Sequence, residues 1–264
     1  LRPDSVAAPA HDEAAQVARE LAEMPDVGTA RADVALVFDY ASAWAWQTQP
    51  QGRDFSYFGL AFDMYRGLRR LGLDVDILPP DTADLSGYAL VLAPGIATIS
   101  APLMAALRAF QGTALLGPRT NAKTAEFAIP LPLPPNLPNL DAVVARVESL
   151  PPDVTVALQG GGAFHRWREK LEGLAEVVES TQDGLPALLR AGGLHYLCGW
   201  PDAAALDRIL TQLCHGADLP THPMPHGLRR RRAGYVTFLF NYNPHEVTFN
   251  GHTLKAADVH WSIP

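Results

Sequence analysis

The sequence predicts an α/β fold, with a mostly parallel sheet flanked by helices, followed by a small antiparallel β domain. Between residues 34 and 214, short apolar runs alternate with helical segments, and short loops connect them. This order is typical of parallel strands joined by right-handed crossovers. After residue 227, apolar residues recur at every second position between turn signals, as in antiparallel hairpins. We therefore expect three parts, at residues 1–30, 31–218 and 219–264.

The first part contains one amphipathic helix, expected over Asp12–Met24 and ended by Pro25. Its apolar side chains share one face at helical spacing: Ala14, Val17, Leu21 and Met24. No strand precedes this helix, so its apolar face needs another part of a protein to pack against. The chain begins with Leu1 rather than Met, and its first ten residues lack the apolar core of a signal peptide. The missing Met suggests a processed or truncated protein.

The second part begins with a strand at Val34–Asp39, which is almost continuously apolar, as expected when both faces are covered. An aromatic loop with Trp44 and Trp46 follows, and then Phe55 and Tyr57 lead into a helix. Open α/β sheets bind ligands or partners at the carboxyl ends of their strands. The loop is therefore the first place to look for a functional surface.

The rest of the second part continues the alternation of strands and helices. We expect a helix at Tyr57–Leu71, with Phe58, Ala61, Phe62, Tyr65 and Leu68 inward and Asp63, Arg66, Arg69 and Arg70 toward water. Ser100 caps a helix at Ala101–Phe110, and Asp202 caps another at Ala203–Cys214. Further strands are expected at Asp74–Leu78, Tyr88–Ala93, Thr113–Leu116, Val143–Ser149, Glu176–Ser180 and Leu194–Cys198. Ile129–Pro138 favours an extended arm, and Trp167–Leu171 a short helical piece.

The third part follows a Pro- and His-containing linker at Leu219–Gly227. Strands are expected at Tyr235–Phe240, Glu246–Phe249 and Val259–Ile263, with a tight turn at Asn250-Gly251. The basic run Arg229–Arg232 is typical of an edge strand, where charge discourages aggregation. Pairing with acidic residues outside this sequence is the alternative.

The composition excludes several classes of function. The 264 residues are 48% hydrophobic and 19% charged, with a net charge of −7. This acidic balance argues against nucleic acid as the main partner, and one short basic run does not change that. No apolar run is long enough for a membrane span. The two cysteines form no disulfide framework and fit a reducing compartment, so we expect a cytoplasmic protein.

Several segments carry a family resemblance, and they occur in the family's order over nearly the whole chain. They are the strand and loop at residues 34–46, Tyr65–Leu68, Val75–Pro80, Leu85–Tyr88 running into Leu92-Ala93-Pro94, and Gly234–Tyr242. Together they resemble the C-terminal portion of glycoside hydrolase family 42 β-galactosidases.

The resemblance implies a fold and an assembly. Residues 31–218 would form a trimerisation domain with a class I glutamine amidotransferase-like, or flavodoxin-like, fold, and residues 219–264 a small β-sandwich-like domain. The helix at Asp12–Met24 would be the last helix of a catalytic barrel that is absent from this sequence. The expected partners are identical copies in a homotrimer and that missing barrel, with neither nucleic acid nor a membrane involved.

The resemblance also implies an activity for the parent enzyme, the retaining hydrolysis of terminal β-D-galactosides. Such chemistry needs two carboxyl groups about 5–5.5 Å apart. In this family both are glutamates on barrel strands, and the acid/base glutamate follows an asparagine. None of the six asparagines here precedes a glutamate. We therefore predict no catalytic residue and an inactive fragment.

Two other functions stay open at this point. A stand-alone amidotransferase-like enzyme would need a cysteine on a strand-to-helix turn, but Thr113–Leu116 runs into Gly117-Pro118-Arg119-Thr120. Cys198 and Cys214 fit buried apolar positions instead. The second alternative is a carbohydrate-binding accessory module that uses the Trp44/Trp46 loop.

Neither a metal nor a cofactor is expected. His215, His222 and His226 are too loosely spaced in a Pro-rich segment for a metal site. Gly160–Gly162 lacks the spacing of a nucleotide-binding loop. The remaining candidates are the aromatic residues Trp44, Trp46, Phe55 and Tyr57, which we predict to lie at a subunit or barrel interface. The alternatives are that they fill the core at the sheet end or, as the lesser option, that they stack on sugar.

Overall fold

The computed structural model describes residues 4–8, 10–28 and 30–263. Residues 1–3, 9 and 29 of the expected first part, and residue 264 of the third, lie outside the described residues. The helices are α1 (His11–Glu23), α2 (Tyr40–Thr48), α3 (Tyr57–Arg70), α4 (Ala101–Ala109) and α5 (Ala203–Gly216). None of the described helices is long and apolar enough to cross a membrane.

The strands form one large sheet and three smaller ones. They are β1 (Val34–Val37), β2 (Val75–Leu78), β3 (Leu90–Ala93), β4 (Thr113–Leu116), β5 (Ala142–Ser149), β6 (Thr155–Ala157), β7 (Ala163–Gly173), β8 (Glu176–Ser180), β9 (Pro186–Ala191), β10 (Leu194–Leu197), β11 (Gly199–Pro201), β12 (Leu228–Ala233), β13 (Val236–Asn241), β14 (Val247–Phe249), β15 (His252–Leu254) and β16 (Val259–Ser262).

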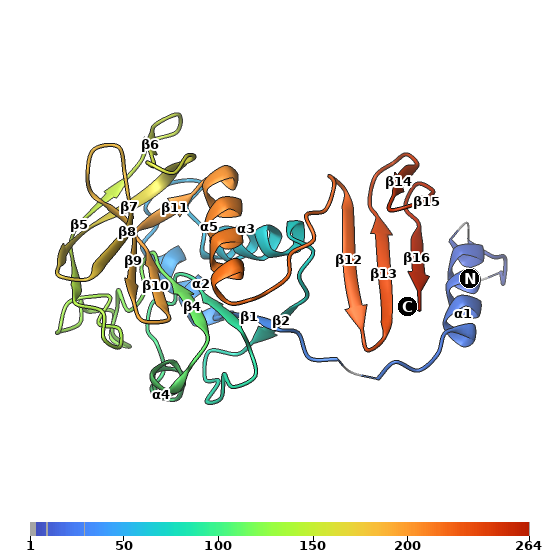
Figure 1. The fold of residues 1–264 in the computed structure, drawn as a ribbon, viewed down its shortest axis with the longest axis horizontal. Coiled ribbons are helices and arrows are strands. Elements are labelled where there is room, and N and C mark those ends of the chain that lie inside the picture. Colours follow the sequence, from blue (N-terminus) through green and yellow to red (C-terminus); the bar gives the residue numbers. More distant parts are fainter. Residues whose placement is uncertain (1–3, 9, 29, 264) are drawn as a thin grey trace.

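The large sheet has the strand order β2-β1-β3-β4-β10-β9-β8 (Figure 1). The strands from β2 to β10 are parallel, whereas β9 and β8 are antiparallel additions. The sheet is therefore mixed, within the α/β class that the sequence predicts. The order reverses between β1 and β3, and such a switch point is where open α/β sheets form a ligand crevice.

Alternating side chains divide the large sheet between two hydrophobic layers. On β1, Val34 and Leu36 pack with the buried faces of α3 and α5. Ala35 and Val37 face the opposite layer, which contains α4 and part of β7. All four side chains of β1 are buried, which explains why its sequence is a continuous apolar run.

The helix caps expected from the sequence are confirmed. Ser100 accepts a hydrogen bond from the backbone of Leu103 at the start of α4. Asp202 does the same for Ala205 at the start of α5, 2.8 Å away. These side chains satisfy amide groups that a helix leaves without partners in its first turn.

One predicted element is wrong, and the predicted inner face of α3 is wrong in part, although Ala61 and Leu68 are buried as expected. Trp167–Leu171 is not helical, because it lies within β7, which pairs with β5, β6 and β11. Pairing on both sides outweighs the helix preference of its charged residues. On α3, Phe58 and Phe62 point outward, and the buried face instead contains Leu60, Met64 and Arg69.

The C-terminal unit is a three-stranded sheet of order β12-β13-β16 with the hairpin β14–β15 folded over it. Its core is small and includes Leu228, Leu239 and Leu254. The buried Asn241 donates hydrogen bonds to the carbonyl groups of His245, Leu254 and Lys255 and so fixes the hairpin. As predicted, the basic run Arg229–Arg232 lies on an edge strand, β12.

Helix α1 lies at the same end of the molecule as the C-terminal sheet (Figure 1). It covers the predicted region, but none of its residues is buried, and Val17 and Leu21 are exposed. The apolar face noted in the sequence is therefore uncovered in the described part of the chain.

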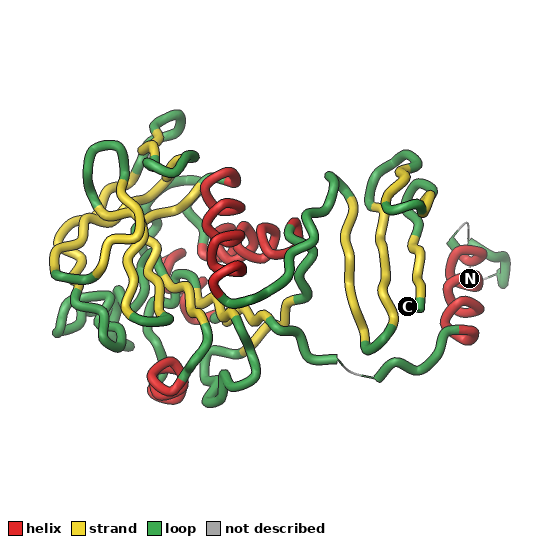
Figure 2. The backbone as a smooth tube through the Cα atoms, viewed as in Figure 1, coloured by secondary structure: helices red, strands yellow, loops and turns green. Residues whose placement is uncertain are grey.

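Arg69 joins the two units. Figure 2 shows a loop, residues 218–227, leading from α5 to β12 without regular structure, as predicted. The Arg69 guanidinium donates to the carbonyl of Arg230 on β12 (2.6 Å) and pairs with Asp74 (3.0 Å). The other Asp74 oxygen accepts from the amide of Arg232. This pair satisfies backbone groups on the outer edge of β12 that would otherwise lack partners.

We expect Arg69→Met to destabilise the protein by about 3 kcal/mol, because it removes one partner of a largely buried ion pair. The loop at residues 218–227 should also become more susceptible to proteolysis. The matched control is Arg190→Met, whose pair with Glu176 is solvent-exposed and should contribute less than about 1 kcal/mol. Urea unfolding with limited proteolysis measures both, and equal losses would contradict the role given to Arg69.

Candidate functional site

The segment after β1 is a helix rather than the predicted loop. Asp39 caps α2 by accepting hydrogen bonds from the amides of Ala41 (3.0 Å) and Ser42 (2.9 Å). The amide of Asp39 donates to the buried Tyr57 hydroxyl, which connects the start of α2 to the start of α3. Burial raises the pKa of Tyr57, so this hydroxyl stays neutral. The cap and the alanines of α2 explain the helix.

Trp46 occupies the switch point of the sheet. Its indole Nε1 donates to the carbonyl of Gly95, which follows β3, at 3.1 Å. Gly95 has a φ of +60°, and a Cβ on it would lie 2.8 Å from the Trp46 ring. Only glycine allows so close an approach in this backbone conformation. The crevice in which such sheets bind ligands is therefore filled by the chain's own indole.

Three of the four candidate interface residues belong to this core. Trp46, Phe55 and Tyr57 are 1%, 7% and 1% exposed, and Trp46 stacks on Phe55 with ring centres 4.5 Å apart. Their burial within one subunit leaves no surface for a partner, so the interface prediction is corrected for these three. Trp44, which is 65% exposed, is the one that a partner could contact.

Arg119 closes the carboxyl end of the central strands. It follows β4 with a φ of +63°, at the position where the amidotransferase alternative requires its nucleophile. Its guanidinium lies 4.9 Å from the ring centre of Trp46, 5.4 Å from Phe55 and 5.3 Å from Trp167. Burial lowers the pKa of Arg119, and the ring faces offset part of the cost of desolvating its charge.

Trp46, Phe55 and Trp167 form an aromatic cage around the Arg119 guanidinium. Glu169 lies next to this cage and is buried. Its carboxyl group accepts hydrogen bonds from the Arg119 amide (2.8 Å) and the Tyr196 hydroxyl (2.6 Å). The Trp167 indole donates to it from 3.4 Å. Desolvation raises the pKa of Glu169. A carboxyl group so completely surrounded by the protein has no route to a substrate.

The chain's two thiols are also unsuited to nucleophilic chemistry. Cys198 and Cys214 are buried, as the sequence predicts, and neither forms a disulfide. Desolvation raises the pKa of both, which disfavours the reactive thiolate. In the described residues, no three His, Cys, Asp or Glu side chains gather as metal ligands would.

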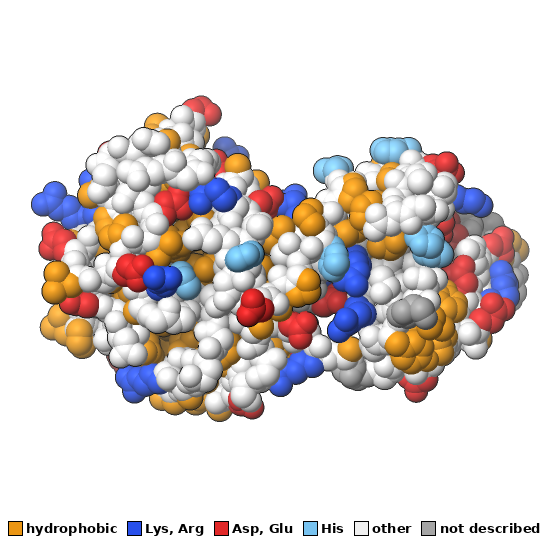
Figure 3. Space-filling model, in the orientation of Figure 1, with side chains coloured by type: hydrophobic (Ala, Val, Ile, Leu, Met, Phe, Trp, Pro, Cys, Tyr) orange, Lys and Arg blue, Asp and Glu red, His pale blue; other side chains and the backbone are white. Residues whose placement is uncertain are grey.

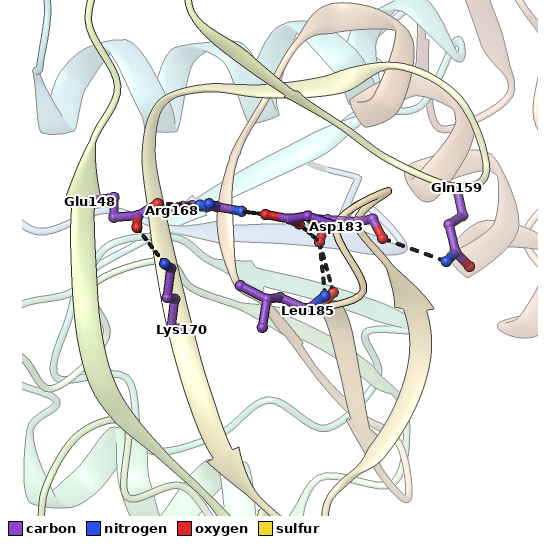
Figure 4. Close-up of polar contacts among 7 residues, drawn as sticks. Glu148, Gln159, Arg168, Lys170, Asp183 and Leu185 are labelled. Carbon is purple, nitrogen blue, oxygen red and sulfur yellow. Dashed lines mark hydrogen bonds and ion pairs between the residues drawn. The ribbon is translucent and has the colours of Figure 1, made fainter.

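An ion-pair network ties the smaller sheet to the large one (Figure 4). Arg168 on β7 pairs with Glu148 on β5, and its other end pairs with Asp183 in the β8–β9 turn at 2.6 Å. Lys170 also contacts Glu148, and Thr181 donates to Asp183. These partners lower the pKa of Glu148 and of Asp183. The network is structural, since every charge in it has a protein partner.

An exposed aromatic surface on α2 and α3 is available for function. We name the side chains of Tyr40, Trp44, Phe58, Phe62 and Arg66 the α2–α3 surface. Tyr40 and Phe58 both contact Phe38, and Phe58 contacts Phe62 with ring centres 6.1 Å apart. Neither residues 40–52 nor 55–62 include a charged residue. Clustered aromatics with few charges are typical of the centre of a protein interface.

The filled switch point and the exposed aromatic surface fit a domain that makes protein contacts. Residues 32–220 match the family described as "Beta-galactosidase trimerisation domain". The chain therefore belongs to this family, the trimerisation domain of glycoside hydrolase family 42 β-galactosidases.

Individual relatives agree with this assignment. A β-galactosidase of Thermus thermophilus is 43% identical over 251 residues, which are 93% of this chain and 39% of that protein. The solved structure of a β-galactosidase from the psychrophilic Marinomonas ef1 has a TM-score of 0.89 and 34% identity. That of Halorubrum lacusprofundi has a TM-score of 0.88 and 28% identity. Each covers 99% of this chain, which spans 43% and 44% of those two chains. The chain is thus similar to less than half of each relative.

We expect Glu169→Ala to destabilise the protein by about 3 kcal/mol, because it leaves the Arg119 amide and the Tyr196 hydroxyl buried without an acceptor. Glu169→Gln keeps the volume and one acceptor oxygen, so its cost should be about 1 kcal/mol. Chemical denaturation of both variants measures the difference. Similar losses for alanine and glutamine would show that these hydrogen bonds contribute little.

The ion-pair network around Arg168 should make the stability of the fold depend on pH in the acidic range. Because the folded-state pKa values of Glu148 and Asp183 are lowered, their stabilisation is fully present above pH 4.5, the higher of their ordinary values of 4.5 and 3.8. It is lost as pH falls through the lowered folded-state values. Wild type should therefore lose more stability on acidification than Arg168→Met does. Parallel pH profiles from thermal unfolding would refute this.

Proposed function

We propose that this chain is the non-catalytic, assembly-supporting portion of a β-galactosidase. The parent enzyme would hydrolyse terminal β-D-galactosides with retention, by means of a catalytic barrel outside this sequence. The observation that carries the proposal is the filled switch point, together with membership of a family described by trimerisation. A domain whose ligand crevice is closed by its own side chains serves the enzyme through contacts rather than chemistry.

We further propose the domain division 1–30, 31–218 and 219–264, and an amidotransferase-like or flavodoxin-like ancestry for the middle domain. The order β2-β1-β3-β4-β10 supports this ancestry, since it follows the 2-1-3-4-5 pattern of flavodoxin-like sheets. The first part would be the last barrel helix, and the uncovered apolar residues Val17 and Leu21 support that reading. Free buried cysteines fit the cytoplasm.

The proposed partners are two further copies of the same chain and the parent's barrel. Trp44 is the interface residue that we retain, because it is large and exposed on a helix without charged residues. Trp and Tyr dominate the energetics of protein interfaces. Sugar stacking by Trp44 is less well supported, since Trp46, the second aromatic of that alternative, is buried.

We expect the 264-residue chain to form trimers at tens of micromolar and to show no hydrolysis of a chromogenic β-galactoside. Trp44→Ser should weaken the association at least tenfold, whereas Leu174→Ser, at an exposed position between β7 and β8, should change it less than threefold. Light scattering over a concentration series measures both. A strictly monomeric wild type would refute self-association, and activity that copurifies with the chain would refute its non-catalytic role.

A further inference from the structure

The α2–α3 surface changes character along α3. Phe58, Phe62 and Arg66 follow one another at intervals of four residues, so they lie on one outward stripe of the helix. All three are exposed. The Arg66 guanidinium lies 5.5 Å from the ring centre of Phe62, so the aromatic part of the stripe ends in a cation.

The C-terminal unit lies next to the end of α3 at which this stripe ends. Arg69, one turn beyond Arg66, donates to the carbonyl of Arg230, which places β12 against the last turn of α3. Arg229 is the next residue on β12. Its pKa is lowered, first by burial and then by the guanidinium groups of Arg69, Arg70 and Arg66. Figure 3 shows Lys and Arg side chains gathered where the two lobes meet, over β12.

Two of these four cations are neutralised and two are not. Arg69 pairs with Asp74, and Arg70 binds both carboxylate oxygens of Asp207. Within the described part of the chain, Arg66 and Arg229 form no ion pair, and Arg229 donates only to the carbonyl of Leu228. Unpaired guanidinium groups held close together repel each other, and a carboxylate placed between them would relieve that repulsion.

We propose that Arg66 and Arg229, flanked by Phe58 and Phe62, form one half of a head-to-tail contact and bind carboxylates on a second copy of this chain. The proposal rests on the self-association proposed above. In a closed ring of three identical subunits each contact joins two different surfaces, so this basic surface would meet another face of the neighbouring copy. The chain has 28 Asp and Glu against 21 Lys and Arg, a net charge of −7, so carboxylates for such a contact are available on a second copy.

The composition of the stripe favours a protein partner. Arginine and aromatic side chains are the residues most enriched at energetically important interface positions. Phe58, Phe62 and Arg66 also lie within residues 32–220, the segment that matches the trimerisation family. The contact would bridge both units of one subunit, because Arg66 belongs to α3 and Arg229 to β12.

The test compares charge reversals in the 264-residue chain by sedimentation velocity. Arg66→Glu and Arg229→Glu should each raise the dissociation constant of the oligomer at least tenfold. Arg66→Lys should restore most of the affinity. The control is Arg108→Glu, which makes the same charge change on the exposed face of α4 and should alter the constant less than threefold. In 1 M NaCl the difference between wild type and the two reversals should shrink. Thermal unfolding verifies that each variant is folded.

The outcomes separate the two proposals. If wild type associates and the reversals behave like Arg108→Glu, this contact is refuted while self-association stands, and the arginines would then face another part of the parent chain. A wild type that is monomeric at every concentration would refute both.

Discussion

The packing of Trp46 into the switch point of the sheet is the constraint on which the rest of this structure depends. Its indole hydrogen-bonds to Gly95, stacks on Phe55 and lies beneath the guanidinium of Arg119. The backbone amide of Arg119 in turn donates a hydrogen bond to the carboxyl group of Glu169 on β7. The central sheet, α2 and the smaller sheet are thus joined at one point. The carboxyl end of the sheet, where related folds bind ligands, serves here to hold the unit together.

This closure explains how α2 divides its side chains. Asp39 starts the helix, Ser42 and Trp46 point into the core, and Tyr40 and Trp44 point to solvent. A helix fixed so firmly on its inner face presents its outer aromatics in one geometry, which lowers the entropic cost of an interface. The same logic applies to α3, where Leu60 and Met64 are buried while Phe58 and Phe62 are exposed. Rigid support beneath an aromatic surface is what an assembly domain requires.

The sequence predicts most of the strands and the caps of α4 and α5, because apolar runs and capping residues are local signals. It fails for α2, since apolar residues on both faces remove the helical period. It fails for β7, because the segment from Trp167 to Leu171 becomes a strand only through its neighbours. On α3, aromatic residues on both faces made the choice of inner face ambiguous. A protein interface places apolar side chains on the surface of the subunit. From the sequence alone, such side chains are expected in the core.

The candidate site illustrates a second limit. The aromatic cluster was identifiable from the sequence, yet its division into three buried rings and one exposed Trp44 depends on the tertiary fold. Glu169 gave no signal, because a charged residue within an alternating strand is expected to face solvent. Arg119 gave none either, because it lies outside regular structure, after the end of β4. Both residues can be buried because Tyr196 donates a hydrogen bond to Glu169 and aromatic rings surround Arg119. These partners come from distant parts of the sequence.

Hydrogen exchange of the tryptophan indole N–H groups, followed by NMR in D2O, tests the closed carboxyl end most directly. The Trp46 indole donates to Gly95 and that of Trp167 to Glu169, and both side chains are buried. These two signals should exchange only on global unfolding, whereas the exposed Trp44 should exchange within the first spectra. Exchange of Trp46 and Trp167 as fast as that of Trp44 would show that this end of the sheet opens to solvent. It would then have to be considered again as a ligand site.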